Sequence, residues 1–238
     1  MRSRRLFGVL VFLIGLSVLS LLLWDPYPTT KASFDRRENG LWLGHKWYTG
    51  YGVRDGVPVT QQESAELIES LDRHGIRHIF IHVGPVGKDG TLPDPLGPTP
   101  DILSRRAPEV QMMAWIGARV DRIDLTNPTF KINLLKSISA LQQAGFDGVH
   151  FDFEPMRDFE TGYLEVLDAV RARMGSDFII SQATPRAAPF GIALGPLRRS
   201  FWSEEFYRET MARSDQTVVM AYDTTLSFRK GYVAFVRH

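Results

Sequence analysis

The stretch from Asp147 to Pro155 constrains the fold of this chain more than any other. It reads Asp-Gly-Val-His-Phe-Asp-Phe-Glu-Pro, so His150, Asp152 and Glu154 alternate with apolar residues. Side chains along a strand point to opposite faces with a period of two, so these three polar groups share one face of any strand they form. A half-solvated antiparallel strand shows the same alternation. The neighbouring segments must decide between a solvated face and a buried polar cluster.

Those segments alternate between strand and helix patterns. Strands are predicted at 41–48, 77–84, 111–118, 147–154, 178–184 and 216–223, and helices at about 60–74, 127–144, 160–174 and from 203 onward. Thr60 and Glu63 form a capping box, and Asn127-Pro128 supplies a helix cap and a first-turn proline. Strands that alternate with helices predict parallel βαβ units with helices covering the sheet.

The parallel order favours the buried polar cluster, because a parallel sheet leaves neither face to water. We expect the carboxylates to point into a TIM-type (β/α)8 barrel, near the C-terminal ends of its strands. A doubly wound sheet is the alternative, but no Gly-rich phosphate loop follows the first strand. Such a barrel usually takes about 250 residues. With about six predicted strands, we expect an incomplete barrel.

The N-terminus predicts membrane targeting. Arg2, Arg4 and Arg5 precede an uncharged apolar run over 6–24 that approaches the roughly 20 residues of a membrane span. This charge bias predicts a signal anchor with its N-terminus in the cytoplasm and the barrel outside. A cleaved signal peptide, cut near 30–32, is the alternative. The expected organisation is a stub and transmembrane helix at 1–24, a tether at 25–40 and the barrel at 41–238.

Composition removes several classes of function. The chain of 238 residues has no cysteine, which rules out disulfides, thiol catalysis and thiolate metal sites. Its net charge is +1, with basic residues spread along the chain, so no nucleic-acid partner is expected. No cofactor is expected either, and His82, His150 and Asp152 lack the spacing of a metal motif.

Two motifs resemble glycoside hydrolase family 18, the chitinase family. Asp147, Asp152 and Glu154 stand in the pattern D-x-x-x-x-D-x-E, which is similar to the family signature D-x-x-D-x-D-x-E. Residues 220–223, Met-Ala-Tyr-Asp, resemble its M-x-Y-D motif on the sixth strand. The resemblance implies a glycosidase that acts on β-linked N-acetylhexosamine glycans by substrate-assisted retention. Two carboxylates on one strand fit this route, because they approach the sugar from one side.

The resemblance also implies roles for single residues. Glu154 would protonate the leaving oxygen, Asp152 would hold the acetamide N–H, and Tyr222 would donate to the acetamide oxygen. Asp223 and Met220 would contact the sugar, and Asp147 would have a structural role.

Other positions are open to more than one interpretation. His150 replaces the family's second aspartate and is expected to hydrogen-bond Asp152, holding it ionised if the imidazole is protonated. Trp47 and Trp115 are candidates for stacking on sugar rings, although aromatic residues in strands commonly belong to the core. The alternative functions are a carbohydrate-binding relative without hydrolysis and an inactive truncated barrel.

Overall fold

The computed structural model describes residues 2–23, 38–52, 54–92, 105–188, 195 and 201–221, with side chains of the first segment described over 8–20. The chain divides into two units, one of residues 35–220 and one of residues 1–34 with 221–238. Tyr222 and Asp223 lie outside the described residues.

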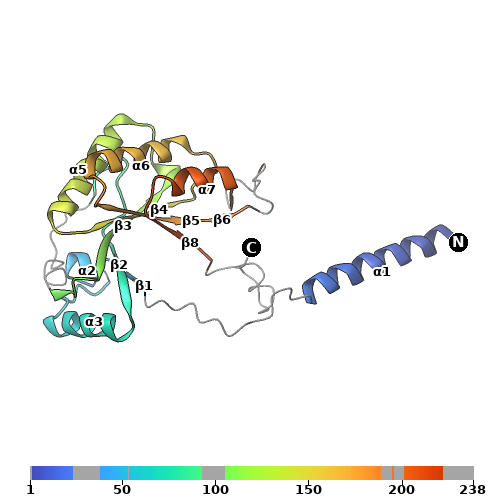
Figure 1. Cartoon of the computed structure of the whole chain (residues 1–238), viewed down its shortest axis with the longest axis horizontal. Coiled ribbons are helices and arrows are strands. Elements are labelled where there is room, and N and C mark those ends of the chain that lie inside the picture. The colour runs from blue at the N-terminus through green and yellow to red at the C-terminus, as the bar shows by residue number, and fades with distance from the viewer. Residues whose placement is uncertain are drawn as a thin grey trace. The chain divides into compact units, whose positions relative to one another are not determined.

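The larger unit is built on a six-stranded sheet (Figure 1). Its strands are β1 (Asn39–Leu43), β2 (Ile76–His82), β3 (Gln111–Arg119), β4 (Gly148–Glu154), β5 (Ile179–Thr184) and β8 (Gln216–Val219). They lie in chain order and every neighbouring pair is parallel. Six parallel strands in sequence order with helices between them form an open, incomplete barrel, as predicted.

Helices lie between the strands, and α3, α5, α6 and α7 are at the positions that the sequence predicts. They are α2 (Lys46–Thr49), α3 (Gln61–Arg73), α5 (Pro128–Gln143), α6 (Thr161–Met174) and α7 (Glu204–Met211), with a 3-10 turn η1 at Val120–Arg122. The predicted caps are confirmed: Thr60 and Glu63 form the capping box, and the Asn127 side chain accepts from the first turn of α5. These caps satisfy backbone N–H groups that the helices leave unpaired.

The structure differs from the prediction after the first strand. The sequence predicted a strand over 41–48, but β1 ends at Leu43, and Trp47 and Tyr48 belong to α2. A second, two-stranded sheet pairs β6 (Arg186–Ala187) with β7 (Phe201–Trp202) and was not predicted.

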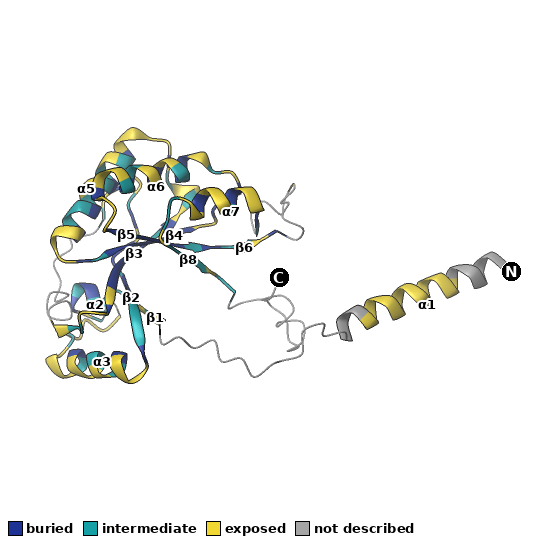
Figure 2. Ribbon diagram, viewed as in Figure 1, coloured by how far each residue is buried: buried dark blue, intermediate teal, exposed yellow. Residues whose placement is uncertain are grey.

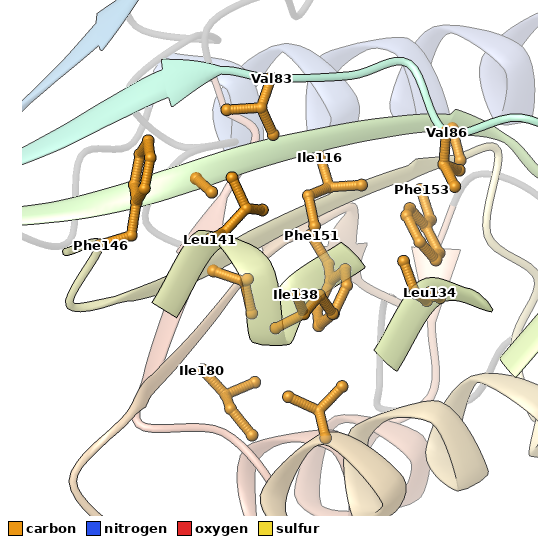
Figure 3. Packing of buried hydrophobic residues seen from close by; sticks show 14 of the residues in the cluster. Val83, Val86, Ile116, Leu134, Ile138, Leu141, Phe146, Phe151, Phe153 and Ile180 are labelled. Atoms are coloured by element: carbon orange, nitrogen blue, oxygen red, sulfur yellow. The ribbon is translucent and has the colours of Figure 1, made fainter. Parts of the chain in front are cut away.

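The helix-facing side of the main sheet carries the apolar core. Phe151 and Phe153 of β4 are buried there with Leu134 and Ile138 of α5 (Figure 3). The helices are buried only where they meet the sheet and exposed on their outer faces (Figure 2). Burying one helix face and one sheet face supplies most of the driving force for this packing. The opposite face carries the polar residues of β4 together with aromatic residues of the neighbouring strands, including Trp42, Phe80 and Trp115.

Asp147 fastens β4 to β3 at its N-terminal end. One carboxylate oxygen accepts from the Met112 backbone N–H at 2.7 Å and from the Arg106 guanidinium at 2.7 Å. These contacts are those of a structural residue, far along the strand from Glu154.

The smaller unit includes the helix α1 (Arg2–Leu23), whose described apolar side chains are exposed. Within the described part of the chain, no helix is both long and apolar enough to cross a membrane. The predicted transmembrane helix is therefore not supported.

Candidate active site

Strand β4 presents its polar side chains on the face opposite the core. His150, Asp152 and Glu154 alternate with Phe151 and Phe153, which are buried against the helices. Exposure increases along the strand, from the fully enclosed His150 through the half-buried Asp152 to the exposed Glu154. The two carboxylates therefore stand at the C-terminal end of β4, which is the edge where barrel enzymes assemble their sites.

Asp152 is held by one of its two carboxylate oxygens. The indole Nε1–H of Trp115, on β3, donates to Asp152 Oδ2 at 2.9 Å. The other oxygen, Oδ1, is buried and has no hydrogen-bond partner among the residues that the structure describes. Burial raises the pKa of Asp152, and the Trp115 hydrogen bond opposes that rise. A buried acceptor without a donor is costly, so Oδ1 is suited to receive a donor from a ligand.

Glu154 stands at the rim, one alternation beyond Asp152. Partial desolvation raises its pKa, and the charge of Asp152 raises it further. Solvent screening limits both effects because the Glu154 side chain is exposed. The direction favours a carboxyl group that keeps its proton to higher pH, as a general acid requires.

His150 bonds across the sheet to β5. Its Nδ1 lies 2.8 Å from the Ser181 hydroxyl, which donates to Gln216 Oε1 at 2.7 Å. Because the hydroxyl proton goes to Gln216, Ser181 accepts from Nδ1–H, and Nε2 is the unprotonated nitrogen. Burial lowers the pKa of His150 to about 3, so the ring is neutral. The hydrogen bond expected between His150 and Asp152 is therefore absent from the described contacts. The neutral His150 also places no positive charge beside Asp152.

Trp115 is packed against a histidine of the neighbouring strand. Its ring meets the ring of His82 edge-on at 4.7 Å. Beside both rings, Gly117 pairs with Asp152 across the strands and has no side chain to fill the adjacent space. A Cβ at Gly117 would lie 3.4 Å from His82 Nε2. A side chain at position 117 would therefore pack directly against His82.

The loop that follows Glu154 is tied down from a distant part of the chain. The Trp202 indole N–H donates to the Met156 carbonyl at 3.1 Å. Asp158 Oδ1 accepts from both the backbone N–H and the hydroxyl of Ser203, at 2.8 and 2.9 Å. These contacts join the β4–α6 loop to β7 and the start of α7.

A groove of about 510 Å³ lies between the loops that follow β3 and β4. Its lining includes Asp121 and Leu125 from the first loop, and Pro155, Arg157 and Glu160 from the second. Pro155 directly follows Glu154 in the chain, so the groove begins beside the rim carboxylate.

The remaining predicted residues fall in different places. Met220 follows β8, where its backbone N–H donates to the Thr184 carbonyl at 2.9 Å. Trp47 lies on α2, packed against the core, with the Lys46 ammonium 4.9 Å from the centre of its ring. Among the described contacts, Trp115 is the one candidate aromatic residue that touches Asp152.

The structure also brings in residues that were not singled out from the sequence. Ser181 and Gln216 form the hydrogen-bonded chain that binds His150, and Gly117 is the strand partner of Asp152 on β3. A polar Ser181 within the otherwise apolar start of β5 was the available signal. No group of three His, Asp or Glu side chains suited to a metal ion occurs among the described residues.

Comparison with known proteins places this fold. No protein-family model matches the chain, and no curated protein matches it. Solved structures do match. The Bacillus cereus spore cortex-lytic enzyme SleL is 17% identical, with a TM-score of 0.58, over 79% of this chain and 42% of its own. A family GH18 chitinase from Chromobacterium violaceum is 14% identical, with a TM-score of 0.57, over 79% of this chain and 51% of its own.

The C-terminal domain of a putative chitinase from Desulfitobacterium hafniense is similar to the same degree, at 14% identity and a TM-score of 0.57. This chain covers 55% of that domain. The chain therefore spans about half the length of the structures it matches. At these identities the comparison shows the fold, which resembles that of family 18 chitinases as the two motifs implied.

Proposed function

We propose that this chain belongs to a glycosidase that hydrolyses β-linked N-acetylhexosamine glycans, with Glu154 as the general acid. One observation carries the proposal. Asp152 and Glu154 stand side by side at the C-terminal edge of an incomplete barrel, and Asp152 Oδ1 is a buried acceptor with no donor among the described residues.

The geometry suits a substrate-assisted reaction. Asp152 Oδ1 accepts the acetamide N–H of the bound sugar and orients its carbonyl oxygen toward the anomeric carbon. That oxygen attacks as Glu154 donates its proton to the leaving oxygen, so the glycosidic bond breaks and an oxazolinium forms. Water then opens the oxazolinium at the anomeric carbon, and Glu154 takes the proton back. The configuration of the anomeric carbon is retained.

The electrostatics fit these two roles. Glu154 needs its proton at the start of the reaction, and both its partial burial and the charge of Asp152 raise its pKa. Asp152 needs a negative charge to stabilise the oxazolinium, and the Trp115 N–H favours that charge. In this proposal Tyr222 donates to the acetamide oxygen, and Met220 and Asp223 contact the sugar.

The structural neighbours support the same class of reaction. They are chitinases and a spore cortex-lytic enzyme by name, and each is similar in fold to this chain, with a TM-score of 0.57 or 0.58. We propose an N-acetylated polymer or oligomer as substrate, either an envelope glycan such as peptidoglycan or chitin.

Glu154→Gln tests the proposal because glutamine keeps the shape of the side chain and cannot donate the proton. We expect the rate of hydrolysis of an aryl β-glycoside of an N-acetylhexosamine oligosaccharide to fall by a factor of about 100 or more. Glu205→Gln, an exposed glutamate on α7, is the matched control and should keep full activity. Unchanged turnover in Glu154→Gln would exclude the assignment of the acid.

A carbohydrate-binding protein without hydrolysis is the second candidate. The specific observation in its favour is the neutral His150 where the family motif has a carboxylate. Saturable binding of the oligosaccharide by the unmodified chain, with no product at any pH, would establish it in place of the glycosidase.

We also propose that residues 35–220 work outside the cytoplasm. The support is the order of Arg2, Arg4 and Arg5 before the apolar run. A reporter enzyme active only outside the cytoplasm, fused after residue 238, should be active in bacteria. Replacing the three arginines by glutamates should reduce that activity, and fractionation shows whether the product is membrane-bound or released.

A further inference from the structure

Trp115 differs from two other aromatic residues on the face of the sheet opposite the core, because its side chain hydrogen-bonds a carboxylate. Trp42 and Phe80, on β1 and β2, stack on each other with ring centres 4.3 Å apart. Trp115 instead directs its indole N–H at the Asp152 carboxylate, 2.9 Å away. A hydrogen bond to an ionised acceptor is about twice as strong as one between neutral groups.

Trp115 is itself held in place by two histidines in series. His82 meets its ring edge-on at 4.7 Å, and the ring of His45 meets that of His82 at 5.6 Å. His45 Nδ1 also lies 3.0 Å from the His82 carbonyl oxygen, and this contact fixes the ring of His45. Burial, and then the neighbouring His45, lower the pKa of His82, which favours the neutral form of the ring that contacts Trp115. The indole therefore has little freedom to leave the carboxylate.

We propose that Trp115 is the positioning residue of this site: it grips Asp152 by Oδ2, keeps that carboxylate ionised, and turns Oδ1 toward the substrate. This proposal rests on the glycosidase function proposed above. In this role Trp115 acts through its hydrogen bond to Asp152 and not by stacking on a sugar ring.

The other groups around Asp152 leave this task to Trp115. His150 is neutral and bonded to Ser181, so it supplies no positive charge. The adjacent Glu154, when ionised, interacts unfavourably with a charge on Asp152. The buried Tyr163 phenol of α6 donates to Gln182 Oε1 at 3.1 Å. Arg119, which pairs with Glu154 in the strand register, directs its guanidinium to Asp121. Within the described residues, the indole N–H is the one hydrogen-bond donor to the carboxylate.

The test compares two replacements of Trp115 in the full chain. Trp115→Phe removes the N–H and part of the ring. Replacing Trp115 by benzothienylalanine keeps the two-ring shape and substitutes sulfur for the N–H, which separates the lost hydrogen bond from lost packing. Trp42→Phe is the matched control, because it removes an indole N–H from the same face without removing the bond to Asp152.

The first readout is the carboxyl titration of Asp152, followed by ¹³C NMR and assigned with Asp152→Asn. Both Trp115 replacements should raise the pKa of Asp152, making its proton-binding constant about 10-fold larger or more, and Trp42→Phe should leave it in place. This measurement needs no turnover. It decides the proposal even if the chain proves to have no glycosidase activity.

The second readout is the pH profile of kcat and KM. Both replacements should move the acid limb of kcat/KM to higher pH and lower kcat about 10-fold or more at the optimum, with KM little changed. An Asp152 titration and acid limb that stay unchanged in a cooperatively folded benzothienylalanine variant would overturn the proposal. A rise in KM alone would do the same, because it would assign Trp115 to sugar binding.

Discussion

His150 and Asp152 project from the same face of β4, two residues apart, yet each side chain bonds to a different neighbouring strand. His150 bonds to Ser181 on β5, and Asp152 accepts from Trp115 on β3. Alternate residues of one strand are about 6.5–7 Å apart, whereas neighbouring strands are about 4.8 Å apart. Partners on adjacent strands are therefore closer than partners on the same strand.

Removing the Ser181 hydroxyl should destabilise the fold. Ser181→Ala removes the acceptor of the buried His150 Nδ1–H and the donor to the Gln216 side-chain oxygen. The expected loss is about 1–3 kcal/mol in the free energy of unfolding, measured by urea denaturation. Ser176→Ala, at an exposed serine, should change it by less than about 0.5 kcal/mol. Equal losses in the two variants would contradict the hydrogen-bonded chain.

The neutral His150 predicts a pH dependence of stability. Its pKa in the folded state is about 3, below the roughly 6.5 of an unfolded histidine. The unfolded state therefore takes up a proton first, and stability falls as pH drops from about 6.5 toward 3. His150→Gln removes this contribution, so the free energy of unfolding of the variant should rise relative to that of the wild type as pH falls. Asp152 and Glu154 titrate in both proteins, so the difference isolates His150, and a difference independent of pH would refute its depressed pKa.

Asp152→Asn should lower the pKa of Glu154. Burial is the larger cause of the raised Glu154 pKa and remains in the variant, while the repulsion from Asp152 disappears. We therefore expect a Glu154 titration by ¹³C NMR that moves down but stays above that of an ordinary glutamate. Asp168→Asn, at an aspartate of α6 that pairs with Arg213, should leave the titration unchanged. An upward shift in Asp152→Asn would show that the two carboxylates do not repel each other.

Helix α5 offers a matched pair for the core. Ile138 is fully buried against the sheet, whereas Ile132 on the same helix is 66% exposed. Ile138→Ala should cost about 2–5 kcal/mol of the free energy of unfolding through lost contacts and the cavity it leaves. Ile132→Ala should cost less than about 0.5 kcal/mol. Similar values at both positions would place the helix in a different orientation.

Local patterns were sufficient to predict the order of the elements. The alternation in β4 and the caps at Thr60 and Asn127 depend on residues close together in the chain, and the structure confirms them. The parallel context also predicted correctly that the carboxylates face away from the helices.

The errors arise where distant or competing interactions decide. Trp47 and Tyr48 have the aromatic character of a strand, but the chain turns at Gly44 and His45 into α2. The β6–β7 pair joins residues fifteen positions apart (186 to 201), each strand being too short to have a sequence pattern. The partners of His150 and Asp152 depend on strand register, which two residues of one strand do not reveal.

The ties from Trp202 to Met156 and from Ser203 to Asp158 bear on the entropy of binding. They restrain the segment that begins immediately after Glu154, so a ligand that binds there meets a loop whose conformation is already fixed. Most of the conformational freedom that an unrestrained loop loses on association is lost here during folding. In the proposed glycosidase, we therefore expect affinity and turnover to depend in part on Trp202, a side chain that lies in the core.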